Sequence, residues 1–315
     1  MENKFISAIK SGDLKQISQF PKSDIHIHAG KGGKREYIEQ WAKTTIELPP
    51  KKFNSLDHMQ QWFVENIRCL TSGVEGVMKR WEAAFKQANE DHIEVLTLSF
   101  STEDAKFVGG MENFMDILTE YNEQLAPHTL FLPELTYDRA SNVDQLVSEI
   151  DEVLSYQFFR SIDVCCNELA QPIKNFKPLY RKAKEAGLRL IAHVGEFGTA
   201  DDVMEAVEEL ELDEVHHGIA AAKSPFVTRW LADHQIQLNI CPSSNVMLNV
   251  VDDYANHPIQ TLFRSGIPVT INTDDLLIFN QTISQEYLNL YEAGTLTAEE
   301  LEQIRLIGLE ERLKR

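Results

Sequence analysis

The stretch that decides the fold is Ser23-Asp24-Ile25-His26-Ile27-His28-Ala29-Gly30, near the start of the chain. Isoleucines alternate with histidines, which is typical of a buried strand, and the glycine marks its end. Side chains two residues apart on a strand point to the same face, so His26 and His28 are expected to aim at one point. Two converging neutral imidazoles form half of a metal site. An ordinary pair of histidines at a strand edge is the alternative that this stretch leaves open.

Three later apolar runs end in residues of the same kind. Residues 188–192 lead into His193-Val194-Gly195-Glu196, residues 213–215 into His216-His217-Gly218, and residues 268–272 into Thr273-Asp274-Asp275. In a parallel α/β barrel the carboxyl ends of all strands meet at one mouth, so residues far apart in sequence converge there. Four such runs favour a metal or proton-transfer site over coincidence.

Composition limits the chain to one large domain or two ordinary ones. Of its 315 residues 43% are hydrophobic, and the formal net charge is −19. This charge argues against nucleic acid or an anionic membrane surface as a partner. No apolar run approaches the roughly 18–20 residues that span a bilayer, and the N-terminal residues do not resemble a signal peptide. Four cysteines without zinc-type spacing indicate a reduced, cytoplasmic protein.

Strand-like and helical patterns alternate along most of the chain. After the His26 run, the expected strands are residues 93–98, 128–135, 161–166, 188–193, 213–217, 236–241 and 268–274. Eight strands separated by helices predict an α/β fold, a (β/α)₈ TIM barrel, in one domain spanning residues 1–315. Residues 37–90 have a helical pattern longer than one crossover requires. We expect them to form an inserted, lid-like segment after the first strand.

Five motifs in order resemble the adenosine deaminases, within the metal-dependent amidohydrolase superfamily. They are His26-Ile27-His28, His193-Val194-Gly195-Glu196, His217-Gly218, Cys241-Pro242-Ser243-Ser244-Asn245 and Asn272-Thr273-Asp274-Asp275. The resemblance runs from about Phe20 to the C-terminus and implies a TIM barrel. It also implies hydrolytic deamination of an aminopurine, in which zinc-bound hydroxide attacks the amine-bearing ring carbon.

The resemblance implies one zinc ion, held by His26, His28, His193 and Asp274. Three imidazoles and one carboxylate suit zinc and leave a position for water, although another divalent transition metal would also fit. Related enzymes with two metals use a modified lysine on a middle strand. Residues 161–166 contain no lysine, so a single metal is expected.

Three further residues match the family's proton carriers. Glu196 matches the proton donor to the purine ring nitrogen, and His217 the histidine that orients the water and helps to deprotonate it. Asp275 matches a carboxylate that holds the water or a ring nitrogen. The alternatives are that Glu196 forms a surface ion pair and that Asp275 caps the next loop. His216, beside His217, is expected to be structural.

The expected substrate contacts are Gly30, Cys166 and Gly195. Adenosine deaminases usually carry an acidic residue, which binds the ribose 5′-hydroxyl, where this chain has Gly30. Cys166 falls where the family has a ring-contacting glycine; both it and its neighbour Cys165 are otherwise interpreted as small buried hydrophobes. The turn after Gly30 is basic, Lys31-Gly32-Gly33-Lys34-Arg35, and an ordinary turn with solvated lysines is the simpler interpretation.

These departures leave the substrate open among adenosine, adenine, a modified adenine and a phosphorylated nucleoside. Without the carboxylate, the site is expected to favour compounds that lack the 5′-hydroxyl or carry an anionic group in its place. The partner is expected to be a small-molecule purine, with no prediction for protein partners. Two other functions remain open: another amidohydrolase reaction, such as cyclic amide or phosphoester cleavage, and a catalytically silent ligand-binding relative.

Overall fold

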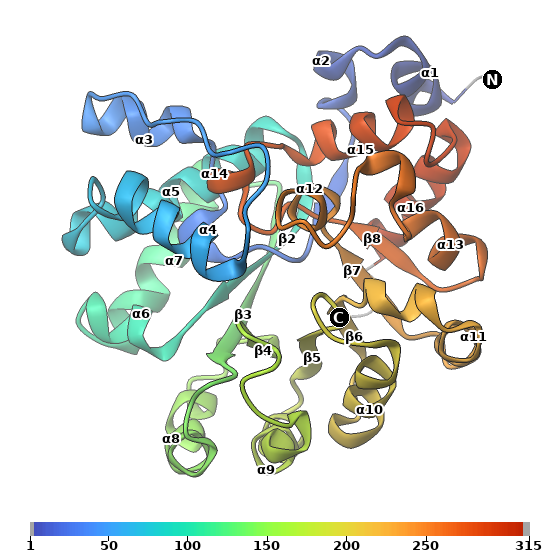
Figure 1. Cartoon of the computed structure of the whole chain (residues 1–315). Coiled ribbons are helices and arrows are strands. Elements are labelled where there is room, and N and C mark those ends of the chain that lie inside the picture. The colour runs from blue at the N-terminus through green and yellow to red at the C-terminus, as the bar shows by residue number, and fades with distance from the viewer. Residues whose placement is uncertain (1–2, 311–315) are drawn as a thin grey trace.

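A computed structural model describes residues 3–310 and shows eight parallel strands, arranged around a nearly closed barrel in chain order (Figure 1). The strands are β1 (Lys22–Asp24), β2 (Ile93–Phe100), β3 (Leu130–Asp138), β4 (Ser161–Cys165), β5 (Arg189–Val194), β6 (Glu214–His217), β7 (Gln237–Ile240) and β8 (Val269–Ile271). Every neighbouring pair is parallel, as the alternation of strands and helices predicts. The predicted TIM barrel is confirmed.

Near the mouth of the barrel, the residues of the histidine motif join the first strand to the segment after the last strand. Strand β1 ends at Asp24, earlier than predicted, because the N–H of Ile25 donates to the side chain of Asn272 instead of to a neighbouring strand. The extended chain beyond it bridges to the segment after β8: the N–H of Asp274 donates to the carbonyl of His26 (3.0 Å), and the N–H of His28 donates to the carbonyl of Asp274 (3.3 Å). The first and last motifs are thereby held side by side.

Helices surround the barrel and bury one continuous core against it. They are α1 (Lys4–Ser11), α2 (Leu14–Ile17), α3 (Arg35–Ala42), α4 (Leu56–Phe63), α5 (Gly73–Glu90), α6 (Thr102–Phe107), α7 (Met111–Leu125), α8 (Val143–Ser155), α9 (Lys177–Glu185), α10 (Ala200–Leu210), α11 (Pro225–Asp233), α12 (Pro242–Met247), α13 (Ile259–Arg264), α14 (Leu276–Phe279), α15 (Ile283–Glu292) and α16 (Ala298–Glu310). Helices α6, α12 and α14, of four to six residues each, are not predicted from the sequence. Within residues 3–310, no helix is long and apolar enough to cross a membrane.

The segment between β1 and β2 contains α3, α4, the π-helix η2 (Val64–Arg68) and α5. It has its own apolar cluster, in which Met59, Trp62 and Phe63 pack with Leu277 and Phe279 of α14. The segment is thus anchored to the loop that follows β8, beside the mouth of the barrel. Its role as a lid stays a prediction.

The glycine-rich turn after His28 is packed against α5. Residues Ala29–Lys31 form the short 3₁₀ helix η1, and α3 begins at Arg35. A Cβ on Gly33 would lie 2.7 Å from the backbone carbonyl carbon of Ala83, and Gly32 is equally buried. These two glycines permit close helix packing.

Candidate active site

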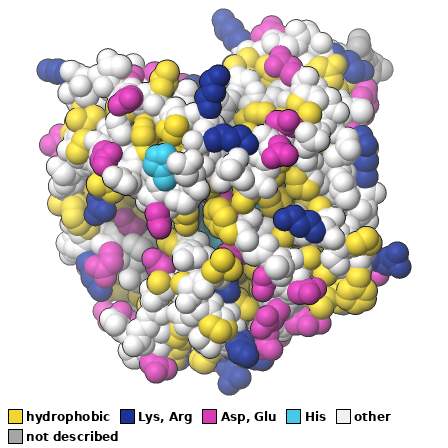
Figure 2. Space-filling view, in the orientation of Figure 1, with side chains coloured by type: hydrophobic (Ala, Val, Ile, Leu, Met, Phe, Trp, Pro, Cys, Tyr) yellow, Lys and Arg dark blue, Asp and Glu magenta, His cyan; other side chains and the backbone are white. Residues whose placement is uncertain are grey.

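A cavity of about 610 Å³ opens at the mouth of the barrel. Figure 2 shows the same face, hollowed near its middle, with hydrophobic and acidic side chains around the hollow. The cavity is lined by eight of the ten residues predicted for the site: His28, Gly30, Cys166, His193, Glu196, His217, Asp274 and Asp275. His26 and Gly195 do not line it. The inserted segment contributes Met59, Phe63 and Arg80, among others, to the wall.

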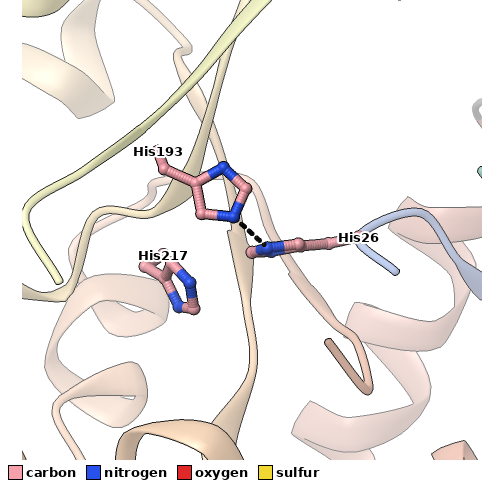
Figure 3. A group of neighbouring side chains, drawn as sticks. All are labelled: His26, His193 and His217. Carbon is pink, nitrogen blue, oxygen red and sulfur yellow. Dashed lines mark hydrogen bonds between the residues drawn. The ribbon is translucent and has the colours of Figure 1, made fainter. Parts of the chain in front are cut away.

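His26 contacts the site from beneath the cavity floor, through His193. Figure 3 shows these two rings with His217, and the Nε2 atoms of His26 and His193 are 3.0 Å apart. The Nδ1 atom of His26 donates to the carbonyl of Asn239 (2.9 Å), and Nδ1 of His193 donates to the carboxylate of Asp163 (2.9 Å). With both protons on Nδ1, neutral rings would direct two Nε2 lone pairs at each other. Such a contact requires a cation between the nitrogens, either a proton or a metal ion.

The electrostatics of the histidines suit metal ligands. Burial lowers the pKa of His26 and of His28 well below the usual value, so both imidazoles are neutral at physiological pH. Burial also disfavours the charged form of His193, but the carboxylate of Asp163 outweighs it and raises the pKa of His193 to about 10. Without metal, His193 therefore carries a proton on Nε2, which it donates to Nε2 of His26, and a metal ion would have to displace this proton. An Asp163-bound imidazole is the arrangement that orients many metal-ligating histidines and increases their basicity.

The carboxylate of Asp274 lies beside the imidazole rings of His28 and His217. Its Oδ1 lies 3.5 Å from Nε2 of His28, and its Oδ2 lies 3.9 Å from Nε2 of His217. Adjacent aspartates on a strand would face opposite ways, but β8 ends at Ile271 and Asp274 has a left-handed backbone (φ 57°). Both Asp274 and Asp275 therefore reach the cavity.

The residues present fit a zinc ion. Within residues 3–310, ligand atoms lie within 4.8 Å of one another in five groups of three residues. Three of these groups are His26, His193 and His217; His28, Asp274 and Asp275; and Glu196, His217 and Asp274. Two imidazoles that share a zinc ion at 2.0–2.1 Å have nitrogens roughly 3.3 Å apart, close to the observed His26–His193 separation. The donor set, imidazole with carboxylate, is the one that zinc prefers.

Glu196 is buried with one oxygen free. Its Oε1 has no hydrogen-bond partner, and its Oε2 lies 3.6 Å from Nε2 of His217. Burial raises the pKa of Glu196 well above its usual value, with Asp274 adding to the effect. This shift favours the protonated carboxyl group, which is the form that a proton donor requires.

The loop that carries Glu196 is held by a second glutamate. The carboxylate of Glu168 accepts hydrogen bonds from the backbone N–H groups of Gly195 (2.6 Å), Phe197 and Gly198. Gly195 has a positive φ of 70°, and a Cβ there would lie 2.3 Å from Val203. Its N–H is occupied by Glu168, so the structure does not support a direct contact between Gly195 and a substrate.

A chain of hydrogen bonds fixes the proton of His217. The N–H of Ile259 donates to Nδ1 of His257 (3.1 Å), so the ring proton of neutral His257 is on Nε2 and is donated to Oδ1 of Asn245 (3.2 Å). The Nδ2 group of Asn245 then donates to Nδ1 of His217 (3.2 Å). Because a backbone N–H cannot reverse its direction, His217 must carry its own proton on Nε2, which faces Glu196.

Asp275 is paired with Lys31. The Nζ atom of Lys31 lies 2.8 Å from Oδ2 of Asp275, and Oδ1 of this aspartate has no partner. Burial raises the pKa of Asp275 to about 6, although the ammonium of Lys31 opposes the shift. The prediction of solvated lysines in this turn is wrong for Lys31, whose side chain is only 15% exposed and is paired with Asp275. Lys34 makes a surface pair with Glu90.

The expectation that both neighbouring cysteines are buried holds for Cys165 and is wrong for Cys166. Cys166 is exposed, lines the cavity and has a positive φ of 73°. The strand ends at Cys165, so the next residue turns its side chain out of the barrel wall. His216 is fully buried, with its ring 3.8 Å above that of His26 and its Nε2 3.2 Å from Glu134.

Several residues that support the site are not predicted from the sequence. They are Asp163, Glu134, Asn239, Glu168 and Asn245. A lone carboxylate inside an apolar strand, such as Asp163 between Ile162 and Val164, is a usable indication of a buried partner. No comparable pattern marks Glu168, which follows the strand in an irregular loop.

The family model for adenosine deaminase matches residues 21–312, nearly the whole chain. This chain belongs to the adenosine deaminase family. The predicted resemblance to adenosine deaminases is confirmed over the range that the motifs indicate.

Individual adenosine deaminase relatives agree with this assignment. A Treponema pallidum protein with the provisional name adenosine/adenine deaminase is 34% identical over 224 residues, which are 66% of this chain and 75% of that protein. The chain spans about half the length of other curated relatives, 49% of a Yersinia pseudotuberculosis adenosine deaminase and 50% of a Psychrobacter cryohalolentis adenine deaminase.

Solved structures show the same fold. The crystal structure of adenine deaminase from Arthrobacter aurescens has a TM-score of 0.79 at 22% identity, covering 92% of this chain and 93% of that one. An amidohydrolase from Burkholderia ambifaria, with bound zinc, has a TM-score of 0.73 at 18% identity, covering 95% of this chain and 87% of that one.

Proposed function

We propose that this chain is a zinc-dependent hydrolase that deaminates an aminopurine. The net reaction replaces the ring amine by oxygen from water and releases ammonia. Family membership supports this activity, since the curated relatives are named for adenosine or adenine deamination. The observation that carries the proposal is the pair of Nε2 atoms on His26 and His193, 3.0 Å apart with both Nδ1 atoms already donating.

The proposed ligands of a single zinc ion are His26, His28, His193 and Asp274. When bound, zinc would supply an acidified water with a pKa of about 7. Asp163 and Asn239 hold two of the imidazoles in the tautomer that leaves Nε2 free. The zinc that the Burkholderia amidohydrolase contains is consistent with this choice of metal.

Three residues are proposed to handle protons. Protonated Glu196, with its free oxygen, gives a proton to the purine ring nitrogen, which withdraws electrons from the amine-bearing carbon. His217 donates from Nε2–H to the incoming oxygen, so its fixed tautomer favours orienting the water over deprotonating it. Asp275, held by Lys31, offers its free Oδ1 to the water or to a ring N–H.

Replacing Asn245 with leucine is expected to lower kcat about tenfold, because His217 then loses the hydrogen bond that selects its tautomer, a contribution of about 1 kcal/mol. Zinc content and KM should change little, since Asn245 is neither a ligand nor a cavity residue. Steady-state kinetics and metal analysis on the same preparation would show whether kcat falls while KM and zinc content stay the same. An unchanged kcat would contradict the proposed role of the hydrogen-bond chain.

Ammonia release from a panel of aminopurines and aminopyrimidines tests the proposed function directly. The expected result is turnover of at least one adenine-containing compound by the zinc-loaded protein, and none after chelation. A zinc-loaded protein that releases ammonia from no aminopurine would contradict the proposal. That result would favour a different amidohydrolase reaction or a silent ligand-binding relative.

A further inference from the structure

One arginine in the cavity wall, Arg80, forms no salt bridge within residues 3–310, although the carboxylate of Asp104 is near enough to attract it. Arg80, on α5, is 9% exposed and lines the same cavity as the proposed catalytic residues. Its Nη1 donates to the hydroxyl (2.5 Å) and the carbonyl (3.3 Å) of Thr71, whereas Nε has no partner. Burial lowers the pKa of Arg80 only to about 10, so the guanidinium stays charged at neutral pH. A buried cation without an ion pair is costly unless a ligand supplies the opposite charge.

The unpaired edge of this guanidinium faces Gly30. A Cβ built on Gly30 would lie 3.6 Å from Nε and 3.7 Å from Nη2 of Arg80. Nη2 has no hydrogen-bond partner and is not among the buried unpartnered atoms of residues 3–310, so it is open to the cavity. Gly30 follows His28 by two residues, so their Cα atoms are at most about 7 Å apart. The free edge therefore lies close to the proposed metal ligands.

The position of Gly30 is the one at which adenosine deaminases usually carry an acidic residue. An aspartate there would stand beside Nε and Nη2 and would neutralise Arg80. With glycine at position 30, the protein supplies the positive charge and omits the negative one. The charge at this end of the cavity is thus the reverse of the charge in adenosine deaminases that carry the acidic residue.

Most of the other charged side chains near Arg80 already have ionic or hydrogen-bond partners. Lys31 is neutralised by Asp275, and both Lys31 and Arg80 contact the ring of Phe63, at 5.4 and 5.6 Å from its centroid. Three further carboxylates line the cavity, and all have partners among the described residues: Asp104, Asp138 and Glu103. A second arginine of the lining, Arg68, is exposed to solvent, so Arg80 is the buried cation of the cavity wall, within residues 3–310, that a ligand can pair with.

We propose that Arg80 binds an anionic group of the substrate, a phosphate or a carboxylate, at the place where the family binds the 5′-hydroxyl. Guanidinium groups recognise both oxyanions through charge-assisted hydrogen bonds. This inference rests on the proposed function, because it takes the remainder of the substrate to be an aminopurine. Of the basic residues in the turn after Gly30, only Lys31 lines the cavity, so the charge comes mainly from the inserted segment.

The test compares kcat/KM for AMP, adenosine-5′-carboxylic acid and adenosine in wild-type protein and variants. Wild type should prefer an anionic compound over adenosine, with AMP favoured if the group is phosphate and the acid favoured if it is carboxylate. Arg80→Met should lower kcat/KM for the preferred anionic compound about 10- to 100-fold more than it lowers kcat/KM for adenosine. Gly30→Asp should reverse the preference, and Arg80→Lys should retain part of it.

Arg229→Met is the matched control, because it removes the same charge from an exposed site on α11, outside the cavity. It should keep the wild-type preference. Should Arg80→Met melt early through loss of its Thr71 contacts, Gly30→Asp still decides the question. Equal kcat/KM for anionic and neutral compounds in wild type, or an unchanged preference in Gly30→Asp, would overturn the proposal.

Calorimetric binding of AMP, adenosine and inorganic phosphate separates this inference from the proposed function. If no purine is deaminated, the proposed function fails. Binding of AMP that is tighter than that of adenosine, and lost in Arg80→Met, would still support an anion subsite. Equal affinity of AMP for wild type and Arg80→Met would refute it.

Discussion

Asp274→Ala is expected to purify with less than roughly half an equivalent of zinc and with no measurable deamination. In the proposed ligand set Asp274 supplies the only carboxylate, and its oxygens lie near Nε2 of both His28 and His217. Its removal leaves three imidazoles without the anionic ligand that offsets part of the metal charge. Atomic spectrometry of the gently purified protein, beside an activity assay, measures both effects.

Backbone conformation complicates this variant and suggests its controls. Asp274 has a φ of 57°, a region that aspartate and asparagine tolerate better than alanine. Asp274→Asn keeps that preference, so it should hold its melting temperature while still losing metal. Asp275→Asn changes the neighbouring carboxylate and should retain zinc. Full zinc occupancy in Asp274→Ala, or loss of zinc from Asp275→Asn alone, would show that the ligand assignment is wrong.

Glu196→Gln is expected to keep its zinc and to lose about 10²–10⁴-fold in kcat, the usual cost of removing a positioned acid or base. Glutamine preserves the shape of the side chain and cannot donate an acidic proton to the ring nitrogen. Glu196 is not among the proposed ligands, and the hydrogen bonds from Gly195, Phe197 and Gly198 to Glu168 hold its loop in either variant. Single-turnover kinetics would place the loss in the chemical step.

Glu208→Gln provides the matched control for this substitution. Glu208 is exposed on α10 and does not line the cavity, so the same chemical change there should leave kcat unaltered. Near-normal deamination by Glu196→Gln at full zinc occupancy would show that Glu196 is not the proton donor.

The strands of the barrel are easier to predict from the sequence than the structure of the turns at its mouth. Apolar runs locate seven of the eight strands, β2 to β8, because a buried strand repeats its apolar pattern over several residues. Strand β1 (Lys22–Asp24) contains no apolar residue, and the predicted first strand is the extended segment after it. The turn after Gly30 shows the limit of that method. The sequence indicated an ordinary turn there, but the turn is packed against α5, and the backbone of Ala83 leaves no room for a Cβ at Gly33. Steric contacts between segments 50 residues apart leave no local pattern.

What the sequence by itself determined is the fold and the family, and it also supplied the residues that we propose to bind metal or carry protons. Residue type and strand position suffice for these, because parallel strands in a barrel must end at one mouth. Only the tertiary structure decided how these residues are charged and oriented. The proton on His217 depends on Asn245 and His257, and the charge beside Gly30 depends on Arg80. Tautomers and buried charges are set by distances between atoms from separate elements, and sequence spacing does not specify those distances.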